Sequence, residues 1–220
     1  LSLSLGFPTP TEPRHQRVFW DVRSRPPSRE SSRTGEFTTF SERTGRADMH
    51  TDSSFIPMPE EHFLLYTVRA ARCGGGASCL IDVDDVVSAL MDTRAGRMAQ
   101  IAMTDVWPFD IQSAFASHPP GQPKSAVGLF PIFSAPFGST SAVNIRWRHD
   151  AILRGLAARP ELCSPSRLTA LSLMHDLIEN NVPCFKHTLD DDSLLWVDNH
   201  HMLHGRTDFT DPDRHLIRVL

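Results

Sequence analysis

The pattern of apolar and polar positions along the chain predicts mostly β-strands. The run HFLLYTVRAA, residues 62–71, has the β-branched and aromatic content of a buried strand. Shorter apolar runs, separated by Gly, Pro and Ser, predict further strands. These runs cover residues 18–20, 37–40, 78–81, 125–133, 141–147, 193–197 and 215–220.

Two stretches have helical spacing instead. Residues 82–92, DVDDVVSALMD, predict a helix whose acidic residues suit its N-terminal end. A second helix is expected after Ser164, which can cap it, and Pro165, which suits a first helical position. Its apolar residues recur at positions 168, 171, 174 and 178, and Asn181 with Pro183 ends it. Many short strands and only two clear helices favour an all-β sandwich or barrel with added helices.

The length of 220 residues suits one domain with a substantial core. About residues 1–36, which are rich in Pro, Ser and Arg, predict one edge strand followed by a mobile loop. The chain begins with Leu rather than Met and ends in the middle of an alternating pattern. We therefore expect residues 1–220 to form a single domain that is incomplete at one or both ends.

Composition and charge narrow the class of protein. An apolar content of 40% and a charged content of 22% are typical of soluble globular proteins. The net charge of -4 gives no reason to expect nucleic acid or an anionic membrane as a partner, and no apolar run is long enough to span a bilayer. The four cysteines form no CxxC pair, so we expect neither a zinc knuckle nor disulfides, and a reduced, cytoplasmic setting.

The run His50-Thr51-Asp52 can carry metal chemistry. In an extended chain, residues i and i+2 point to the same side, so His50 and Asp52 can present an imidazole and a carboxylate to one point. One distant His would complete three ligands on one face of an octahedral metal. The three positions left open are those that non-haem Fe(II) oxygenases use. Because a three-residue match is common by chance, an ordinary surface loop is the alternative.

The last apolar run contains a single Arg. Alternation places Arg218 on one face with Leu216 and Leu220, and the opposite face is also mainly apolar, so Arg218 is expected in the interior. A buried guanidinium needs an anion. A bound dicarboxylate, gripped in bidentate fashion, is one candidate. An ion pair with an acid elsewhere in the chain is the other.

Several segments taken together resemble a known family. These segments are HTDSSFIPMPE, GGGASCLID, WVDNHHMLHGRTDF and RHLIR. In order and spacing they resemble the taurine dioxygenase/clavaminate synthase-like family of Fe(II)- and 2-oxoglutarate-dependent dioxygenases. The resemblance covers about residues 37–92 and 193–220. The middle of the chain, where such enzymes usually choose their substrates, is not recognisable in detail.

By position, the resemblance implies that His50, Asp52 and His204 bind iron. It implies a mainly β fold, the double-stranded β-helix, which is a cupin-like jelly-roll barrel with a few flanking helices. The implied chemistry uses Fe(II), dioxygen and the cosubstrate 2-oxoglutarate, which is decarboxylated to succinate. The carboxylate of Asp52 favours hydroxylation, because halogenating relatives have a small residue there. We thus expect a dioxygenase that oxidises an unactivated C–H bond of a small molecule, an amino acid or a natural-product intermediate.

The resemblance also implies how the cosubstrate is held. Arg218 matches the Arg that pairs with the distal carboxylate of 2-oxoglutarate. Ser78 and Arg214 match positions that help to hold the same molecule. Asn199 and Arg206 match the DN and HGR signatures of the family, and we expect structural roles for them around the metal.

Other residues have weaker signals. Arg146 and Arg148 alternate in NIRWR and so are expected on one face of a strand, from which an Arg could bind a substrate carboxylate; a solvent-facing edge strand is the alternative. His200 and His201 beside His204 are expected in ordinary packing or surface positions. The large aromatic residues Trp107, Phe109, Phe130 and Phe133 are expected in the core.

Two other functions remain open. A non-catalytic jelly-roll binding protein that keeps a relic of the metal site would form no succinate. A zinc hydrolase could use the same two His and one Asp, and its activity would not depend on 2-oxoglutarate. That second alternative leaves Arg218 and the glycine-Ser segment without a purpose.

Overall fold

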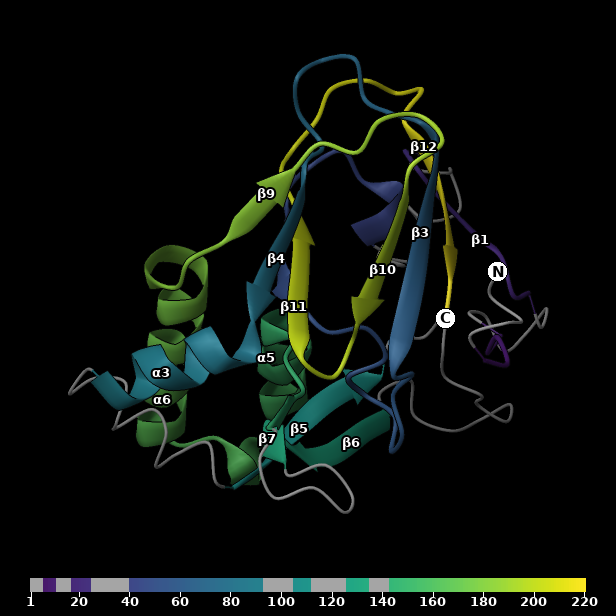
Figure 1. Ribbon diagram of the computed structural model, residues 1–220. Helices are drawn as coiled ribbons and strands as arrows, with labels where there is room; N and C mark the ends of the chain where they lie inside the picture. Colours follow the sequence, from purple (N-terminus) through teal and green to yellow (C-terminus); the bar gives the residue numbers. More distant parts are fainter. Residues whose placement is uncertain (1–5, 11–16, 25–39, 93–104, 112–125, 135–142) are drawn as a thin grey trace.

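Two four-stranded antiparallel sheets form the body of the protein (Figure 1). The computed structural model describes residues 6–10, 17–24, 40–92, 105–111, 126–134 and 143–220. The first sheet has the order β1 (Trp20–Arg23), β12 (His215–Val219), β3 (His62–Arg69) and β10 (Leu194–Asp198). The second sheet has the order β2 (Ala47–His50), β11 (Met202–Arg206), β4 (Ser78–Asp82) and β9 (Phe185–His187).

The chain alternates between these two sheets. Strands β2, β3 and β4 belong to the second, first and second sheet, and β9 to β12 alternate in the same way. Such crossing at each connection is the arrangement of a double-sheet jelly roll. The mainly β, cupin-like fold expected from the sequence is therefore confirmed. Among the described residues no strand of one sheet pairs with a strand of the other, so the two sheets do not close into a barrel.

Alternation along the strands gives the second sheet two different faces. Met49, Ile81 and Leu203 belong to the main hydrophobic core, which they share with the helices. His50 and His204 come from the opposite face, where the ring of His204 contacts Phe63 of the first sheet. The space between the sheets is therefore lined by polar side chains as well as apolar ones.

The helices gather on the side of the second sheet (Figure 1). They are α3 (Val83–Asp92), α5 (His149–Ala158) and α6 (Pro165–Asp176), which continues into a π-turn, η3 (Leu177–Asn181). Two short 3-10 helices are η1 (Phe40–Glu42) and η2 (Pro160–Leu162). Two further small antiparallel sheets consist of β5 (Val106–Ile111) with β6 (Ala126–Pro131), and of β7 (Phe133–Ser134) with β8 (Asn144–Ile145). Helix α5 approaches β5 closely, because a Cβ at Gly155 would lie 2.2 Å from the carbonyl oxygen of Pro108.

Most predicted elements are present, with some corrections. Helix α6 begins after Ser164 as expected, and Ser164 Oγ accepts a hydrogen bond from the backbone N–H of Arg167 at 3.3 Å. Helix α5 was not expected, although its buried residues 151, 152, 155 and 156 follow helical spacing. Phe40 lies in a 3-10 helix rather than a strand, and residues 37–39 lie outside the described residues. Of the strand expected at 141–147, residues 141–142 lie outside the described residues, and within the rest only Asn144–Ile145 forms a strand.

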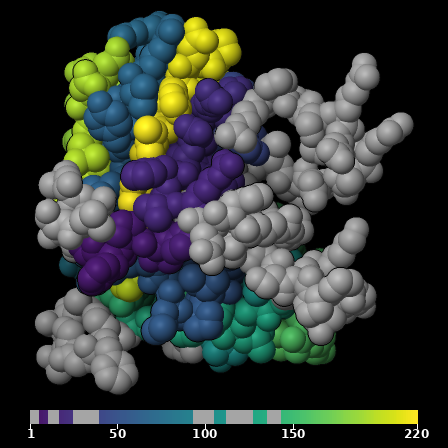
Figure 2. Space-filling view, turned by 90° about the vertical axis from the view of Figure 1, so that its right-hand side faces the viewer, coloured from purple at the N-terminus to yellow at the C-terminus, as the bar shows by residue number. Residues whose placement is uncertain are grey.

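The two ends of the chain meet on the first sheet. Strand β1, the edge strand expected near residues 18–20, pairs with β12 and places Trp20 opposite Arg218. The backbone N–H of Thr9 donates to the carbonyl oxygen of Leu220 at 2.8 Å. Figure 2 shows these N-terminal residues lying across the C-terminal strand. None of the described helices is both long and apolar enough to cross a membrane.

Candidate metal centre

Strand pairing brings His50 and His204 together. His50 is the last residue of β2 and lies directly opposite His204 in the middle of β11. Both imidazoles therefore point to the inner face of the second sheet, with ring centroids 4.2 Å apart. Asp52 lies two residues beyond His50, in a turn rather than in extended chain, and its carboxylate reaches the same point.

These three side chains have the geometry of a metal site. Nε2 of His50 lies 3.9 Å from Oδ1 of Asp52, and Nε2 of His204 lies 3.8 Å from Oδ2. One ligand atom from each residue lies within 4.8 Å of the others, and no other such group exists in the part of the chain that the structure describes. Two ligand atoms that each lie about 2 Å from one metal, at right angles to each other, are about 3 Å apart. The three side chains would therefore have to move together only slightly to bind one metal ion. We call these residues the triad.

Neighbouring polar groups hold the triad in place. Nδ1 of His50 donates to the carbonyl oxygen of Asp48 at 2.7 Å. The ring proton is therefore on Nδ1, and the lone pair of Nε2 is free to bind a metal. Asn199 Oδ1 accepts from the backbone N–H of Asp52 at 2.8 Å. The amide of Asn199 donates to the carbonyl oxygens of Asp52 and Glu60, at 3.2 and 2.8 Å. Partners of this kind orient metal ligands.

The protonation states of the triad suit metal binding. Burial lowers the pKa of His204 to about 4. Burial, together with the nearby charges of His204 and Arg148, also lowers the pKa of His50 well below its ordinary value. For Asp52, burial by itself raises the pKa, but Arg218 and the two imidazoles outweigh it and hold the pKa below its ordinary value. Neutral imidazoles and an ionised carboxylate are the forms that bind metals.

Arg218 faces the triad from the first sheet. It lies in β12 with 17% of its side chain exposed, so the interior position expected from alternation is essentially correct. Its Nη1 donates to both carboxylate oxygens of Asp52, at 3.0 and 2.9 Å. Its Nε is buried and has no acceptor among the described residues. The acid that pairs with Arg218 in this structure is therefore a member of the triad.

A cavity of about 70 Å³ lies between the two sheets beside the triad. All three residues expected to hold the cosubstrate line it, and they are Ser78, Arg214 and Arg218. Ser78 is 8% exposed and begins β4, which pairs with β11 next to His204. The second sheet thus contributes imidazoles and a hydroxyl to the cavity, and the first sheet contributes a guanidinium.

Arg214 is the more deeply buried guanidinium. It is 5% exposed, and its Nη2 donates to the carbonyl oxygen of Gly76 at 3.4 Å. Its Nη1 is buried without an acceptor in the described part of the chain. Gly76 has a φ of +78°, and a Cβ there would lie 2.9 Å from Nε of Arg214. The glycine run is therefore a turn that makes room for this side chain.

The residues present fit Fe(II) with 2-oxoglutarate. Two imidazoles and one carboxylate leave half of an octahedral coordination shell open. Buried guanidinium nitrogens on Arg214 and Arg218 lack acceptors, and a dicarboxylate would supply them. To bind it, Arg218 would exchange part of its contact with Asp52 for the cosubstrate.

The side chains of Arg146 and Arg148 have different surroundings in the structure. Arg146 donates to the carbonyl oxygens of Ser54, Ile56 and Pro57 at 2.5–3.2 Å, and its guanidinium lies 4.3 Å from the ring centre of Phe130. It therefore secures the turn that follows Asp52. The shared strand face expected for the two arginines does not form, because β8 ends before either residue.

Arg148 lies close to the triad. It is 9% exposed, and its guanidinium lies 4.6 Å from the ring centre of Phe40, which in turn lies 5.2 Å from the ring of His50. Its Nε donates to Asp150 at 3.2 Å, while Nη1 and Nη2 donate to no described residue. A solvent-facing position, the alternative reading of the sequence, is wrong for Arg148.

Other residues near the triad have structural roles. Nη2 of Arg206 donates to the carbonyl oxygens of Arg43 and Gly45, both at 2.7 Å, and so clamps the segment before β2. His200 contacts a backbone carbonyl and His201 a neighbouring carboxylate, which are ordinary positions. Trp107 and Phe109 are fully buried in the core, as expected.

Sequence reasoning missed two aromatic rings that cover the imidazoles. The ring of Phe63 lies 4.4 Å from that of His204, and the ring of Phe40 lies beside His50. Alternation along β3 could have placed Phe63 on the inner face. Phe40 lies ten positions before His50, in a 3-10 helix that precedes β2, and the strand expected at residues 37–40 did not indicate that its ring returns to His50.

Sequence comparison extends the resemblance over the whole chain. The model of the family "Taurine catabolism dioxygenase TauD, TfdA family" matches residues 3–220. The match includes the middle of the chain, where the individual motifs gave no signal. None of the curated proteins matches this sequence.

Solved non-haem iron oxygenases have a similar fold. Asparagine oxygenase in complex with Fe(II), 2S,3S-3-hydroxyasparagine and succinate has a TM-score of 0.71 and 19% identity, over 98% of this chain and 60% of that one. The oxygenase OrfP with Fe and alpha-ketoglutaric acid has a TM-score of 0.63 and 16% identity, over 99% of this chain and 61% of OrfP. OrfP with Fe, succinate and (3S)-hydroxy-L-Arg has a TM-score of 0.64 and 17% identity, over 99% of this chain and 60% of OrfP. This chain thus spans about 60% of the length of these chains.

Proposed function

Because the chain belongs to the TauD/TfdA dioxygenase family, we propose that it is an Fe(II)- and 2-oxoglutarate-dependent dioxygenase that hydroxylates a small molecule. The observation that carries this proposal is the triad of two imidazoles and a carboxylate, whose imidazoles line a cavity together with Arg214 and Arg218. When bound, iron and 2-oxoglutarate would supply the oxidation chemistry, in which one atom of dioxygen enters an unactivated C–H bond of the substrate and the other enters succinate as the cosubstrate loses carbon dioxide.

The triad would hold the iron. His50 and His204 would bind it through Nε2, and Asp52 through one carboxylate oxygen. The contact of His50 with Asp48 and the hydrogen bonds from Asn199 keep the ligands oriented before the metal arrives. The low exposure of His50 and Asp52, 6% and 5%, limits access of water to the site.

Arg218 would bind the distal carboxylate of 2-oxoglutarate, with Arg214 and Ser78 beside it. Support comes from their common position on the cavity wall and from the guanidinium nitrogens that lack acceptors among the described residues. Guanidinium groups suit carboxylates because they offer parallel donors. The hydroxyl of Ser78 adds a neutral donor at the start of β4, an interior strand of the second sheet.

The substrate class follows from the similar enzymes and from one more arginine. The structures of asparagine oxygenase and OrfP hold hydroxylated amino acids. We propose an amino acid or a related natural-product intermediate as substrate here. Arg148 is the better candidate for its carboxylate, because it is buried near the triad with two nitrogens that donate to no described residue. Arg146 would first have to leave the three carbonyl oxygens that it holds.

We propose a cytoplasmic location for the reaction. All four cysteines, Cys73, Cys79, Cys163 and Cys184, are free thiols, which agrees with a reducing setting. The hydrolase alternative leaves the buried guanidiniums of the cavity without a ligand, and the complete triad together with Arg218 speaks against a relic site, so we favour the oxygenase.

The iron assignment can be tested by anaerobic spectroscopy. Adding Fe(II) and 2-oxoglutarate should produce a weak visible charge-transfer band. His204→Ala should abolish the band, because it removes a ligand, whereas His201→Ala, three residues away, should retain it. A band of unchanged strength in His204→Ala would show that the iron assignment is wrong.

The same preparation separates the competing functions. Succinate formation on addition of oxygen and a panel of amino acids supports the oxygenase. A band without succinate for any substrate would indicate a binding protein, and hydrolytic activity independent of 2-oxoglutarate would indicate a zinc enzyme.

A further inference from the structure

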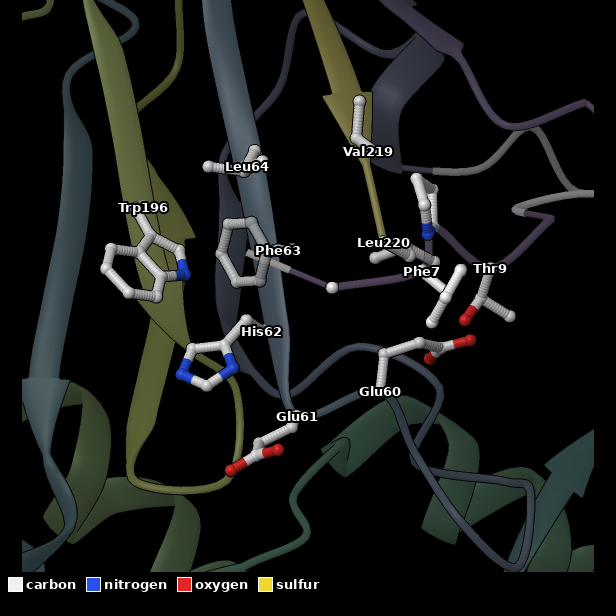
Figure 3. A pocket seen from close by; sticks show the side chains of 12 residues that line it. Phe7, Thr9, Glu60, Glu61, His62, Phe63, Leu64, Trp196, Val219 and Leu220 are labelled. Atoms are coloured by element: carbon white, nitrogen blue, oxygen red, sulfur yellow. The ribbon is translucent and has the colours of Figure 1, made fainter. Parts of the chain in front are cut away.

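The first sheet carries a second pocket, on the side away from the helices (Figure 3). Its volume is about 510 Å³, and residues 6–9 and the end of β12 form part of its wall. Leu64 lies between Trp196 on β10 and Val219 on β12 in the strand register. These three side chains form an apolar wall across three adjacent strands, and all of them line the pocket.

An exposed indole stands at one side of this pocket. Trp196 is 53% exposed, and the ring of His62 lies 5.2 Å from it at an angle of 42°. Together with Leu64 and Val219 this indole forms a continuous apolar surface, and such contiguous surfaces mark contacts with ligands or partners more often than single exposed residues do. The negative face of an indole also attracts cations more strongly than other aromatic rings do.

Two carboxylates lie at one end of the same pocket. Glu60 and Glu61 precede β3, and Figure 3 shows both side chains among those that line the hollow. Oε2 of Glu60 is buried and has no hydrogen-bond partner among the described residues, and neither Glu forms an ion pair with a described Lys or Arg. A buried carboxylate oxygen without a donor is costly, so a bound donor would stabilise it.

The pocket is distinct from the triad. Phe63 borders both spaces, but it is only 1% exposed, and its ring packs on His204. A molecule in this pocket would therefore be separated from the ligand atoms by a phenyl ring. Its binding does not depend on whether the triad holds iron.

We propose that this pocket binds a small organic cation, an alkyl guanidine or amine. The cationic head would pair with Glu60, whose carboxylate has the unpaired oxygen, and the alkyl part would lie against Leu64, Val219 and the face of Trp196. An aromatic and aliphatic wall suits such a molecule better than an inorganic dication, which requires six or more oxygen ligands. The pocket is also much larger than a single metal ion needs.

Calorimetric titration of the full chain with butylguanidinium tests this proposal. Butylguanidinium should bind with a dissociation constant of about 1 mM or lower, and the uncharged isostere butylurea should bind at least about tenfold more weakly. Glu60→Gln should weaken butylguanidinium binding about fivefold or more, because it removes the charge that pairs with the head, whereas Glu61→Gln should have a smaller effect. Asp84→Asn, an exposed acid on α3, is the matched control and should have no effect.

A second pair of variants tests the aromatic contribution. Trp196→Leu should weaken binding several-fold, whereas Trp196→Phe should retain most of it. Equal binding of butylurea, an equal effect of Asp84→Asn, or no binding at about 10 mM butylguanidinium would each overturn the proposal. Tight binding of Mg²⁺ alone that depends on both Glu residues would also overturn it, in favour of an inorganic cation site. Circular dichroism of each variant verifies that it is folded.

Discussion

Asp52 is the residue on which the proposed site depends most. Its carboxylate faces two imidazoles and accepts two hydrogen bonds from Arg218, and its backbone is held on both sides by Asn199. A carboxylate that is 5% exposed needs positive charge nearby. In the structure described, Arg218 supplies that charge. A metal ion at the triad would supply it instead and release Arg218 for the cosubstrate.

This exchange predicts how Arg218→Met should behave. Without metal, the substitution leaves Asp52 unpaired, and the free energy of unfolding should fall by about 1–3 kcal/mol. Addition of Mn(II) should reduce the deficit, because the ion then neutralises Asp52. Urea denaturation with and without Mn(II) measures both values, and Arg159→Met, an exposed arginine on the surface, serves as control. A deficit that is the same with Mn(II) would contradict the proposed exchange.

At the scale of elements, strand pairing positions the metal ligands, and helix packing stabilises the sheet that carries them. The pairing of β2 with β11 sets His50 opposite His204, whereas the helices support the other face of the same sheet. Helices α5 and α6 meet through two stacked rings. His149 begins α5, and its ring lies 3.9 Å from that of His175 in α6, with an angle of 8° between them.

This stacked pair predicts a pH dependence of stability. Burial, and then the charge of His175, lowers the pKa of His149 to about 4, from an ordinary value of 6.5 in the unfolded chain. A lowered folded pKa means that the unfolded state binds the proton first. Stability should therefore be fully present above pH 6.5 and fall as the pH drops towards 4.

His149→Gln should weaken this dependence. The free energy of unfolding of the variant, measured by urea denaturation, should decline less than that of the wild type between those two pH values. His187→Gln, on the exposed strand β9, should follow the wild-type curve. Parallel curves for His149→Gln and wild type would show that this ring contributes nothing to the acid sensitivity.

At the scale of the whole molecule, the triad joins segments far apart in the chain. His50 and Asp52 come from the first quarter and His204 from the last, and the two sheets bring Arg218 to the same cavity. The unfolded chain cannot hold these groups together, so a metal should bind the native state selectively.

Metal binding should therefore stabilise the fold. At a free Mn(II) concentration of about 100 times the dissociation constant, the free energy of unfolding should rise by about 2.7 kcal/mol. Asp52→Ala should lose most of this gain, whereas Asp48→Ala, which leaves the backbone carbonyl that holds His50, should retain it. The measurement is the shift of the urea midpoint with added Mn(II). An equal shift in Asp52→Ala would place the metal elsewhere.

Local sequence patterns determined many of the elements and the chemical character of the site. The β-branched and aromatic content of residues 62–71 predicted β3, alternation predicted the inward position of Arg218, and capping by Ser164 predicted the start of α6. These signals are local, because strand alternation and helix capping depend on residues a few positions apart. Helix α5 could also have been found from its spacing. Motif order then indicated the family, which the sequence match over residues 3–220 confirms.

Only the tertiary structure decided which groups meet. The contact of Arg218 with Asp52, the ring of Phe63 over His204, and the contact of Arg148 with Phe40 all join segments distant in sequence. The pocket between Glu60 and Trp196 arises in the same way, from strands that pair across more than 100 positions. Such contacts follow from sheet order and register, which no short stretch of sequence specifies. For this reason the sequence could name the triad but not the partners around it.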